Sequence, residues 1–439
     1  MELEQQVHRL WPDFHDAPEA PPYGPEPLPY RNVCDSRDGF FEGQILTMPR
    51  RTEVFLIYAT GLIQGLALVT FPAASSIFTS PHGYGFSASR YGMMFIPQVV
   101  LAILASSMGP RLARRCSLKR VLLSGLSADL LAMILLASSR LLQNLPEAAY
   151  VILLVATGAL GFGFGAVVMA TNTYAQVFSP GRENRAVLVL NTLLGAGTAL
   201  APLLVALFVG LGAWWLLPVV VAVLVLGLLL VGAKEPLVAA TGDAGSSSSE
   251  GLPSQFWLFA AAVLLYGIAE TLNGNWSGPY LTGERGVSAQ VASYALTAFW
   301  GMVTVGRLIF AALSSGKSVR WIYVGLPTAL ILAFQAVAHV GGETGSVFAF
   351  GLAGLACSAF FPLCISLSGR AFPRFAEATS GILVAFYQSG YGIAAFGVGP
   401  LRDLAALSFR TIYSLGSLVA ALILSVAIAV VGRMVKRNG

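Results

Sequence analysis

The chain has 439 residues, of which 56% are hydrophobic and 11% are charged, and its formal net charge is +5. A soluble globular protein has about 25% charged residues, so this composition excludes an ordinary soluble domain. It indicates an integral membrane protein whose surroundings are a lipid bilayer.

Residues 1–53 differ in composition from the rest of the chain. They hold ten of the 21 acidic residues and five of the 26 basic ones, which gives this segment a net charge of −5. They also contain a proline-rich run: Pro18, Pro21, Pro22, Pro25, Pro27 and Pro29. Such a polar segment cannot bury a core, and no apolar stretch typical of a secretory signal follows the start. We expect a disordered cytoplasmic tail; the alternative is a docking segment.

From Val54 onward the chain consists of apolar segments of roughly 20 residues, the length that crosses the apolar core of a bilayer. Six predicted helices precede a polar break, at 54–78, 89–112, 121–139, 148–174, 184–210 and 213–233. Six follow it, at 255–280, 289–312, 320–340, 346–370, 377–399 and 408–433. The break, 234–254, is rich in Gly and Ser and is predicted to be a flexible cytoplasmic linker. The sequence therefore predicts a six-helix bundle at 54–233 and another at 255–439.

The basic residues predict the orientation of these helices, because Lys and Arg that flank the spans stay on the cytoplasmic side. If the N-terminus is cytoplasmic, twenty of the 26 basic residues lie inside the cell and five lie outside, with Arg307 within a helix. An odd number of helices would destroy this asymmetry halfway along the chain. We therefore expect both termini in the cytoplasm.

Similar signals recur in the same order on both sides of the linker. The fourth and tenth predicted helices are glycine-rich and are followed by Phe-Ser-Pro at 178–180 and Phe-Pro at 372–373. The fifth and eleventh contain Ala-Pro at 201–202 and Gly-Pro at 399–400. Duplicated helix bundles around a central axis are how secondary transporters build alternating access, with the substrate near the membrane midplane.

The hinge between the second and third predicted helices resembles the signature of the major facilitator superfamily. In that signature a glycine precedes Leu-Ala-Asp-Arg, a second glycine and several basic residues. The matching residues are Gly109, Leu112, Ala113, Arg115, Lys119 and Arg120. Arg114 stands where the family has its acid, which helps to lock the two halves at the cytoplasmic side, and Ser117 stands where it has the second glycine. The resemblance implies an all-α membrane protein of twelve transmembrane helices in two pseudo-symmetric six-helix bundles. It also implies gating roles for Gly109, Arg115, Lys119 and Arg120.

Three stretches resemble the fucose/galactose/glucose permease branch of this superfamily. They are Gly161 to Gly165 leading to Asn172, then Asn191 with Gly195, Gly197 and Pro202, and finally Tyr266-Gly267 with Glu270, Trp276, Tyr280, Trp300 and Gly306-Arg307. Proton-coupled permeases of this branch have acids in the first and fourth helices. This chain has Gln64 in its first helix and Val168 about one turn before Asn172.

Three charged residues lie well inside predicted helices: Asp129, Glu270 and Arg307. Charges inside a membrane are costly, so each one is a functional candidate. From the helical rise per residue, Glu270 lies roughly 20 Å and Arg307 roughly 8 Å from the cytoplasmic ends of their helices. This difference in depth excludes a direct salt bridge between them.

Glu270 is the main candidate for proton coupling, because a carboxyl group in a low-dielectric cavity can bind and release a proton near neutral pH. The family resemblance adds that the seventh helix lines the cavity. The alternative is a neutral carboxyl group that is hydrogen-bonded to a neighbouring helix. Asp129 is a second proton-coupling candidate, and its alternative is a structural polar contact. Arg307 resembles the family's Gly-Arg element at a cytoplasmic gate, which implies a gating residue that bonds carbonyl or carboxylate groups in the outward-open state. Its alternative is an arginine that extends to the membrane interface.

Neutral polar side chains in the predicted helices fit a hydroxyl-rich ligand, because amides form paired hydrogen bonds and aromatic rings cover C–H surfaces. The substrate-binding candidates are Gln64, Asn172, Asn191, Asn273, Trp276, Tyr280, Trp300 and Gln388. Asn275, Tyr387 and Tyr391 belong to the same polar set. Each of these side chains could instead form a helix–helix hydrogen bond or lie at the membrane interface.

Several other activities are excluded by missing residues. Gly316-Lys317-Ser318 resembles the end of a phosphate-binding loop, but Ala311 occupies the position of its first glycine. The four histidines and four cysteines show no metal-ligand spacing. A membrane-embedded enzyme would need clustered His, Asp or Ser groups at one interface, which this chain lacks. We therefore expect neither an enzyme nor a protein that binds a metal, a cofactor or nucleic acid.

We expect a secondary active transporter that moves a small, polar, sugar-like solute across the cytoplasmic (inner) membrane by alternating access, coupled to protons. Its partners are then a small-molecule substrate and the proton, and we expect a monomer. One alternative is a proton-driven efflux carrier for a metabolite or drug. Another, of a different class, is a non-transporting membrane sensor. Facilitated diffusion is open as well, because the acids of the sugar-permease branch are missing.

Overall fold

A computed structural model describes residues 49–238, 252–313, 318–372 and 376–438. The expected disorder of the tail concerns residues that lie almost wholly outside these ranges, and so does most of the predicted linker. Within the described residues, twelve helices are long and apolar enough to cross a membrane. The predicted number of transmembrane helices is therefore confirmed. Helices suit a lipid bilayer because their backbone N–H and C=O groups bond each other within the segment, and the lipid offers these groups no partners.

The first half of the chain forms six spans. Its elements are α2 (Arg51–Ala73), α3 (Ser75–Thr79), α4 (Ala88–Met93), α5 (Phe95–Cys116), α6 (Leu118–Ser138), the 3₁₀ helix η1 (Ser139–Leu142), α7 (Pro146–Val177), α8 (Glu183–Gly210) and α9 (Leu216–Lys234). The pairs α2–α3, α4–α5 and α6–η1 each form one interrupted span. α7 begins with a proline, whose fixed φ suits the first position of a helix.

The second half repeats this arrangement. Its elements are α10 (Phe256–Gly283), α11 (Ala289–Leu313), α12 (Ser318–His339), α13 (Glu343–Cys357), α14 (Phe360–Ala371), α15 (Ala376–Asp403) and α16 (Phe409–Asn438). α13 and α14 form one span that is interrupted at Ser358 and Ala359. The sequence predicted one continuous helix there from its apolar length, although Pro362 has no N–H to bond the carbonyl oxygen of Ser358 four residues earlier.

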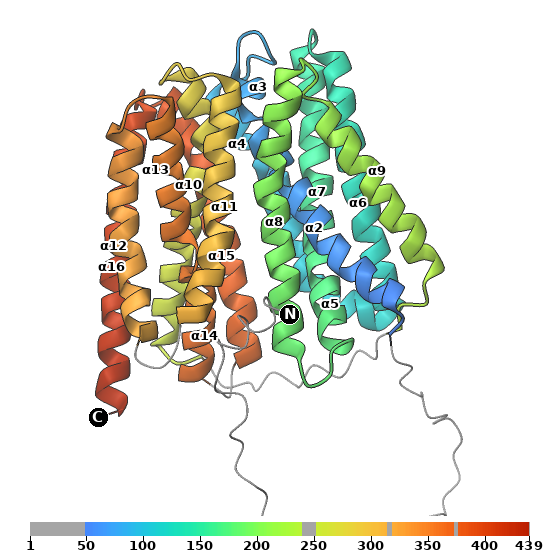
Figure 1. Cartoon of the computed structure of the whole chain (residues 1–439), viewed down its shortest axis with the longest axis vertical. Coiled ribbons are helices and arrows are strands. Elements are labelled where there is room, and N and C mark those ends of the chain that lie inside the picture. Colours follow the sequence, from blue (N-terminus) through green and yellow to red (C-terminus); the bar gives the residue numbers. More distant parts are fainter. Residues whose placement is uncertain (1–48, 239–251, 314–317, 373–375, 439) are drawn as a thin grey trace, which may run out of the picture. The chain divides into compact units, whose positions relative to one another are not determined.

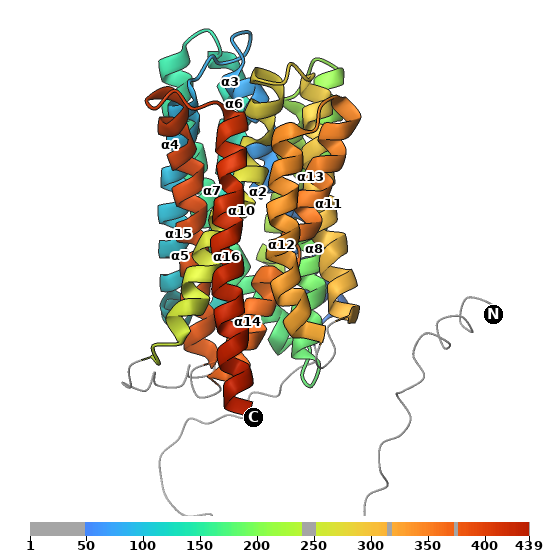
Figure 2. The same cartoon turned by 90° about the vertical axis from the view of Figure 1, so that its left-hand side faces the viewer.

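Each half forms its own bundle. In Figure 1, α2 to α9, coloured blue to green, occupy the right-hand bundle, and α10 to α16, coloured yellow to red, occupy the left-hand one. α12 and α16 lie side by side in both views (Figures 1 and 2). The first residues of α2 and the last of α16 lie at the same end of the bundles (Figure 1). We call the opposite end, which includes 75–93, 275–283 and 395–403, the far end.

Glycines show that the two bundles are built alike. A Cβ on Gly65 of α2 would lie 2.0 Å from the carbonyl oxygen of Leu194 in α8. A Cβ on Gly390 of α15 would likewise lie 2.0 Å from the carbonyl oxygen of Leu264 in α10. The first and fifth spans therefore approach backbone to backbone, as do the seventh and eleventh. Small residues allow this close packing between membrane helices.

The two bundles are joined at the far end. The backbone N–H of Ser89 donates to a carboxylate oxygen of Asp403 at 2.7 Å, and the Tyr91 hydroxyl donates to the carbonyl oxygen of Asn275 at 2.9 Å. The rings of Tyr91 and Trp276 meet edge to face, with their centroids 5.1 Å apart. Hydrogen bonds and aromatic packing therefore hold the far end closed in this conformation.

Candidate functional site

A cavity lies between the bundles, and both of them contribute to its wall. Its volume is about 60 Å³. It is lined by Leu68, Val69 and Pro72 of α2, Gln98, Val99 and Ala102 of α5, Phe164 of α7, Glu270, Thr271 and Asn275 of α10, Trp300 of α11, and Tyr387, Gln388 and Tyr391 of α15. At about 10–15 Å³ for each water, this space holds a few water molecules.

Glu270 is the acidic residue in the wall of this cavity. Its side chain is only 3% exposed. The Tyr266 hydroxyl donates to its Oε1 at 2.7 Å, and the Tyr387 hydroxyl donates to its Oε2. An isolated buried charge is costly, and hydrogen bonds to both oxygens reduce that cost. The two tyrosines therefore hold the carboxyl group in one orientation beside the cavity.

Three further polar atoms of the cavity wall are buried and have no hydrogen-bond partner among the described residues. They are the indole Nε1 of Trp300, the hydroxyl of Thr271 and the amide oxygen of Gln98. Leaving a buried polar group unpaired costs about 1–3 kcal/mol. Two donors and an acceptor around one small space are therefore suited to bind the polar groups of a ligand.

Asp129 occupies a different place, inside the first bundle. It is 1% exposed, and neither of its carboxyl oxygens has a partner among the described residues. Gln64 of α2 faces it, but the amide nitrogen of Gln64 is also without a partner in the part of the chain described. Gly163 of α7 makes room, because a Cβ there would lie 2.1 Å from Oδ1 of Asp129. Asp129 and Gln64, both predicted site residues, therefore lie next to each other inside the first bundle, and neither lines the cavity.

The other predicted binding residues separate into two groups. Trp300 and Gln388 line the cavity, as Glu270 does. Asn191 donates to the side-chain oxygen of Asn172 at 3.2 Å and thereby links α8 to α7, outside the cavity wall. Asn273 is fully buried and donates to the carbonyl oxygen of Ala269.

Trp276 and Tyr280 do not line the cavity. The Trp276 indole donates to the carbonyl oxygen of Ala394, and the Tyr280 hydroxyl donates to that of Val337. Both rings are fully buried and pack against Phe409 of α16. Their polar atoms are already used between helices, which is the alternative that the sequence left open for them.

The predicted gating residues are spread over two places. Gly109 packs against Met169 of α7, and Arg115 and Arg120 are exposed. Lys119 donates to the carbonyl oxygens of Ala233 and Glu235, so its charge lies at the C-terminal end of α9, where it is favourable. The Nε of Arg307 donates to the carbonyl oxygen of Ser358 at 3.3 Å, at the interruption between α13 and α14.

The cavity wall also contains two residues that are not among the predicted binding residues, Gln98 and Thr271, and three of the wider polar set, Asn275, Tyr387 and Tyr391. Gln98 could be predicted from the sequence, since it is an amide in the second predicted helix. Thr271 could not be predicted, because hydroxyl side chains inside membrane helices commonly bond the carbonyl four residues back.

Comparison with known proteins agrees with this arrangement. The model of the Major Facilitator Superfamily matches residues 54–395. No curated protein sequence matches the chain. A solved nucleoside transporter superimposes with a TM-score of 0.71 at 13% identity, over 86% of this chain and 99% of that one. A D-xylose–proton symporter gives 0.67 at 13% identity, over 86% and 96%. The fucose–proton symporter of E. coli gives 0.54 at 19% identity, over 86% and 97%.

These structural likenesses concern the fold, since the identities are low. The family match covers most of the described helices and includes the cavity residues from both bundles. Twelve spanning helices in two similar bundles are the architecture that the hinge and the internal repetition predicted. This chain therefore belongs to the major facilitator superfamily of membrane transporters.

Proposed function

We propose that this protein is a secondary transporter that carries a small, polar, sugar-like solute through the cavity between its bundles, coupled to the movement of protons. The observation that carries the proposal is the position of Glu270: a buried carboxyl group, held by two tyrosine hydroxyls, in the wall of a cavity with unpaired polar atoms. A group that binds a proton next to the solute can make the binding of one depend on the other.

The asymmetry of the basic residues supports a cytoplasmic position for both termini in the inner membrane. The far end then faces outward. Because the hydrogen bonds of Ser89 and Tyr91 close that end, we infer a state that is closed toward the outside. Asp129, buried beside Gln64, is proposed as a second site of protonation.

The test is uptake by the purified protein in liposomes, with nucleosides, pentoses, hexoses and small peptides as solutes. We expect Glu270→Gln to abolish accumulation driven by a proton gradient and to spare exchange of the same solute at equal concentrations, because an amide cannot release a proton. Both are measured with radiolabelled solute. Glu343→Gln, a change of the same kind on an exposed residue of α13, is the control and should leave both at the wild-type level. Undiminished accumulation in Glu270→Gln would refute proton coupling at this residue.

The same liposomes distinguish the alternatives. A carrier that works as an exporter accumulates solute in vesicles that have the opposite gradient. A facilitator equilibrates solute and never accumulates it. A non-transporting sensor shows neither exchange nor accumulation with any compound.

A further inference from the structure

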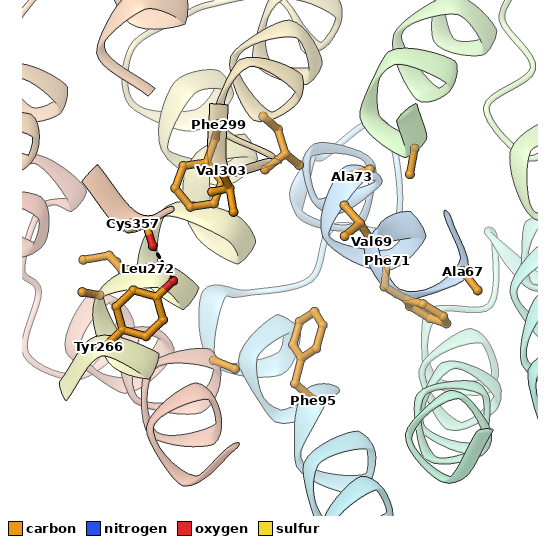
Figure 3. Close-up of a cluster of buried hydrophobic side chains, with 14 of the residues drawn as sticks. Ala67, Val69, Phe71, Ala73, Phe95, Tyr266, Leu272, Phe299, Val303 and Cys357 are labelled. Atoms are coloured by element: carbon orange, nitrogen blue, oxygen red, sulfur yellow. Dashed lines mark hydrogen bonds between the residues drawn. The ribbon is translucent and has the colours of Figure 1, made fainter. Parts of the chain in front are cut away.

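The interruption of the tenth span is held by side chains from two other helices. α13 ends at Cys357 and α14 begins at Phe360. The carbonyl oxygen of Cys357 accepts a hydrogen bond from the Tyr266 hydroxyl at 2.8 Å (Figure 3). That of Ser358 accepts one from the Nε of Arg307 at 3.3 Å. The interruption is therefore tied to α10 by Tyr266 and to α11 by Arg307.

Tyr266 has two acceptors for one proton. Its hydroxyl oxygen lies 2.7 Å from Oε1 of Glu270 and 2.8 Å from the carbonyl oxygen of Cys357. A phenol has a single O–H to donate, whereas a carbonyl oxygen can only accept. Both contacts are full two-centre hydrogen bonds at the same time only if Glu270 donates in one of them, and it donates only when it is protonated; otherwise one O–H is shared between two acceptors, which weakens both contacts.

The two protonation states of Glu270 therefore give two patterns. When Glu270 carries a proton on Oε1, it donates to Tyr266, and Tyr266 donates to the carbonyl of Cys357. When Glu270 is ionised, it attracts the Tyr266 proton, since hydrogen bonds to a charged acceptor are stronger. The carbonyl of Cys357 then loses its donor. The Tyr387 hydroxyl donates to Oε2 in both states.

We propose that Tyr266 is a positioning residue that transmits the protonation state of Glu270 to the interruption between α13 and α14. Protonation ties the end of α13 to α10, and release of the proton frees it, so α14 can move relative to α10. The proposal rests on the proposed role of Glu270 as the proton-binding group, and it adds the route by which that proton acts on a helix.

The helices packed against α10 carry other titratable groups, near Glu270 or further along α10, and none of them replaces this link. They are Tyr387 and Tyr391 on α15, Arg307 on α11, Cys357 on α13, Cys364 on α14 and Tyr413 on α16. The facing stretches of α2 and α3, 68–72 and 75–79, contain no residue that titrates. Cys364 and Tyr413 bond carbonyl oxygens of Phe259 and Leu272 in α10, away from the interruption.

Tyr266→Phe tests the link, because it removes the hydroxyl and keeps the ring that stacks on Phe360 and Phe361. We expect exchange to continue and proton-driven accumulation to fall by about tenfold or more, which corresponds to one hydrogen bond to an ionisable group. Tyr413→Phe is the matched control, since it removes a buried hydroxyl that donates to the carbonyl oxygen of Leu272 in α10, away from Glu270 and from the interruption. It should retain both exchange and accumulation.

The movement itself can be measured by spin-label distances between Ser366 on α14 and Trp257 on α10, both exposed, in a variant whose four cysteines are replaced. We expect the distance distribution of the otherwise unchanged protein to shift with pH. That of Tyr266→Phe should not shift. Glu270→Gln, whose amide can donate to Tyr266 permanently, should stay at the low-pH distribution at every pH.

The outcomes separate this proposal from the one on which it rests. Full accumulation in Glu270→Gln overturns proton binding at Glu270. The role of Tyr266 alone is overturned by a different pair of results. In that case Glu270→Gln loses accumulation, whereas Tyr266→Phe accumulates solute fully and its label distance shifts with pH as in the otherwise unchanged protein. If Tyr266→Phe does not fold, a pH-dependent distance in Glu270→Gln overturns the link by itself.

Discussion

Ser117 shows how one residue departs from the family pattern at a cost. It forms the whole turn between α5 and α6, and its φ of 107° lies in the region that only glycine adopts readily. The family has glycine at this position of its hinge signature. The Ser117 side chain compensates in part, because it accepts a hydrogen bond from the N–H of Arg120 at 3.3 Å at the start of α6.

Ser117→Gly should therefore stabilise the protein. Relief of the unfavourable φ gains about 1–2 kcal/mol, and loss of the serine cap to glycine costs only a few tenths. We expect a higher midpoint of thermal unfolding in detergent, measured by circular dichroism. Ser127→Gly, in the interior of α6 where glycine weakens a helix, should lower the midpoint. Equal or lower stability of Ser117→Gly would contradict the argument.

At the scale of helices, the joint at the far end depends on α4 and α15. Asp403, the last residue of α15, accepts from the backbone N–H of Ser89 in the first turn of α4. A carboxylate is favourable at the N-terminal end of a helix, where the peptide dipoles leave partial positive charge. Gly399 lets the helices approach, because a Cβ there would lie 2.6 Å from Cα of Ser89.

Asp403→Asn should weaken this joint and shift the molecule toward states that are open at the far end. The loss of about 0.5–1 kcal/mol from an exposed charge near a helix end changes the ratio of states about twofold to fivefold. Spin labels at the exposed positions His82 and Leu404 report the distance across the far end. In the protein that retains Asp403, high salt should produce part of the same shift in the distance between these labels. A distribution that Asp403→Asn leaves unchanged would rule out a closing role for the carboxylate.

The sequence predicted the helices better than their interruptions. Apolar length alone placed all twelve spans, since the bilayer fixes how many residues a helix needs. The interruption at Ser358 and Ala359 has a signal in Pro362, which offers no N–H to the carbonyl oxygen of Ser358, but the side chains of α10 and α11 that bond the freed carbonyl oxygens could not be predicted. Such partners come from positions about 50 and 90 residues away along the chain.

At the scale of the whole molecule, the cavity depends on how the helices are rotated, and the sequence does not determine that rotation. α10 is buried on nearly all sides, so its residues show no polar face that would point to the cavity. Glu270 could be assigned from the rarity of acids in membranes. The sequence could not distinguish Trp276 and Tyr280, which lie outside the cavity wall, from Thr271 and Asn275, which lie on the same helix and line the cavity.

The central claim is that solute movement through this cavity is coupled to protons. The most direct test records internal pH in liposomes that contain the wild-type protein while nucleosides, sugars or small peptides are added outside. We predict that one of these compounds acidifies the interior as it enters, and that liposomes containing Glu270→Gln show no acidification with the same compound. Entry of that compound into wild-type liposomes without any change of internal pH would contradict the account.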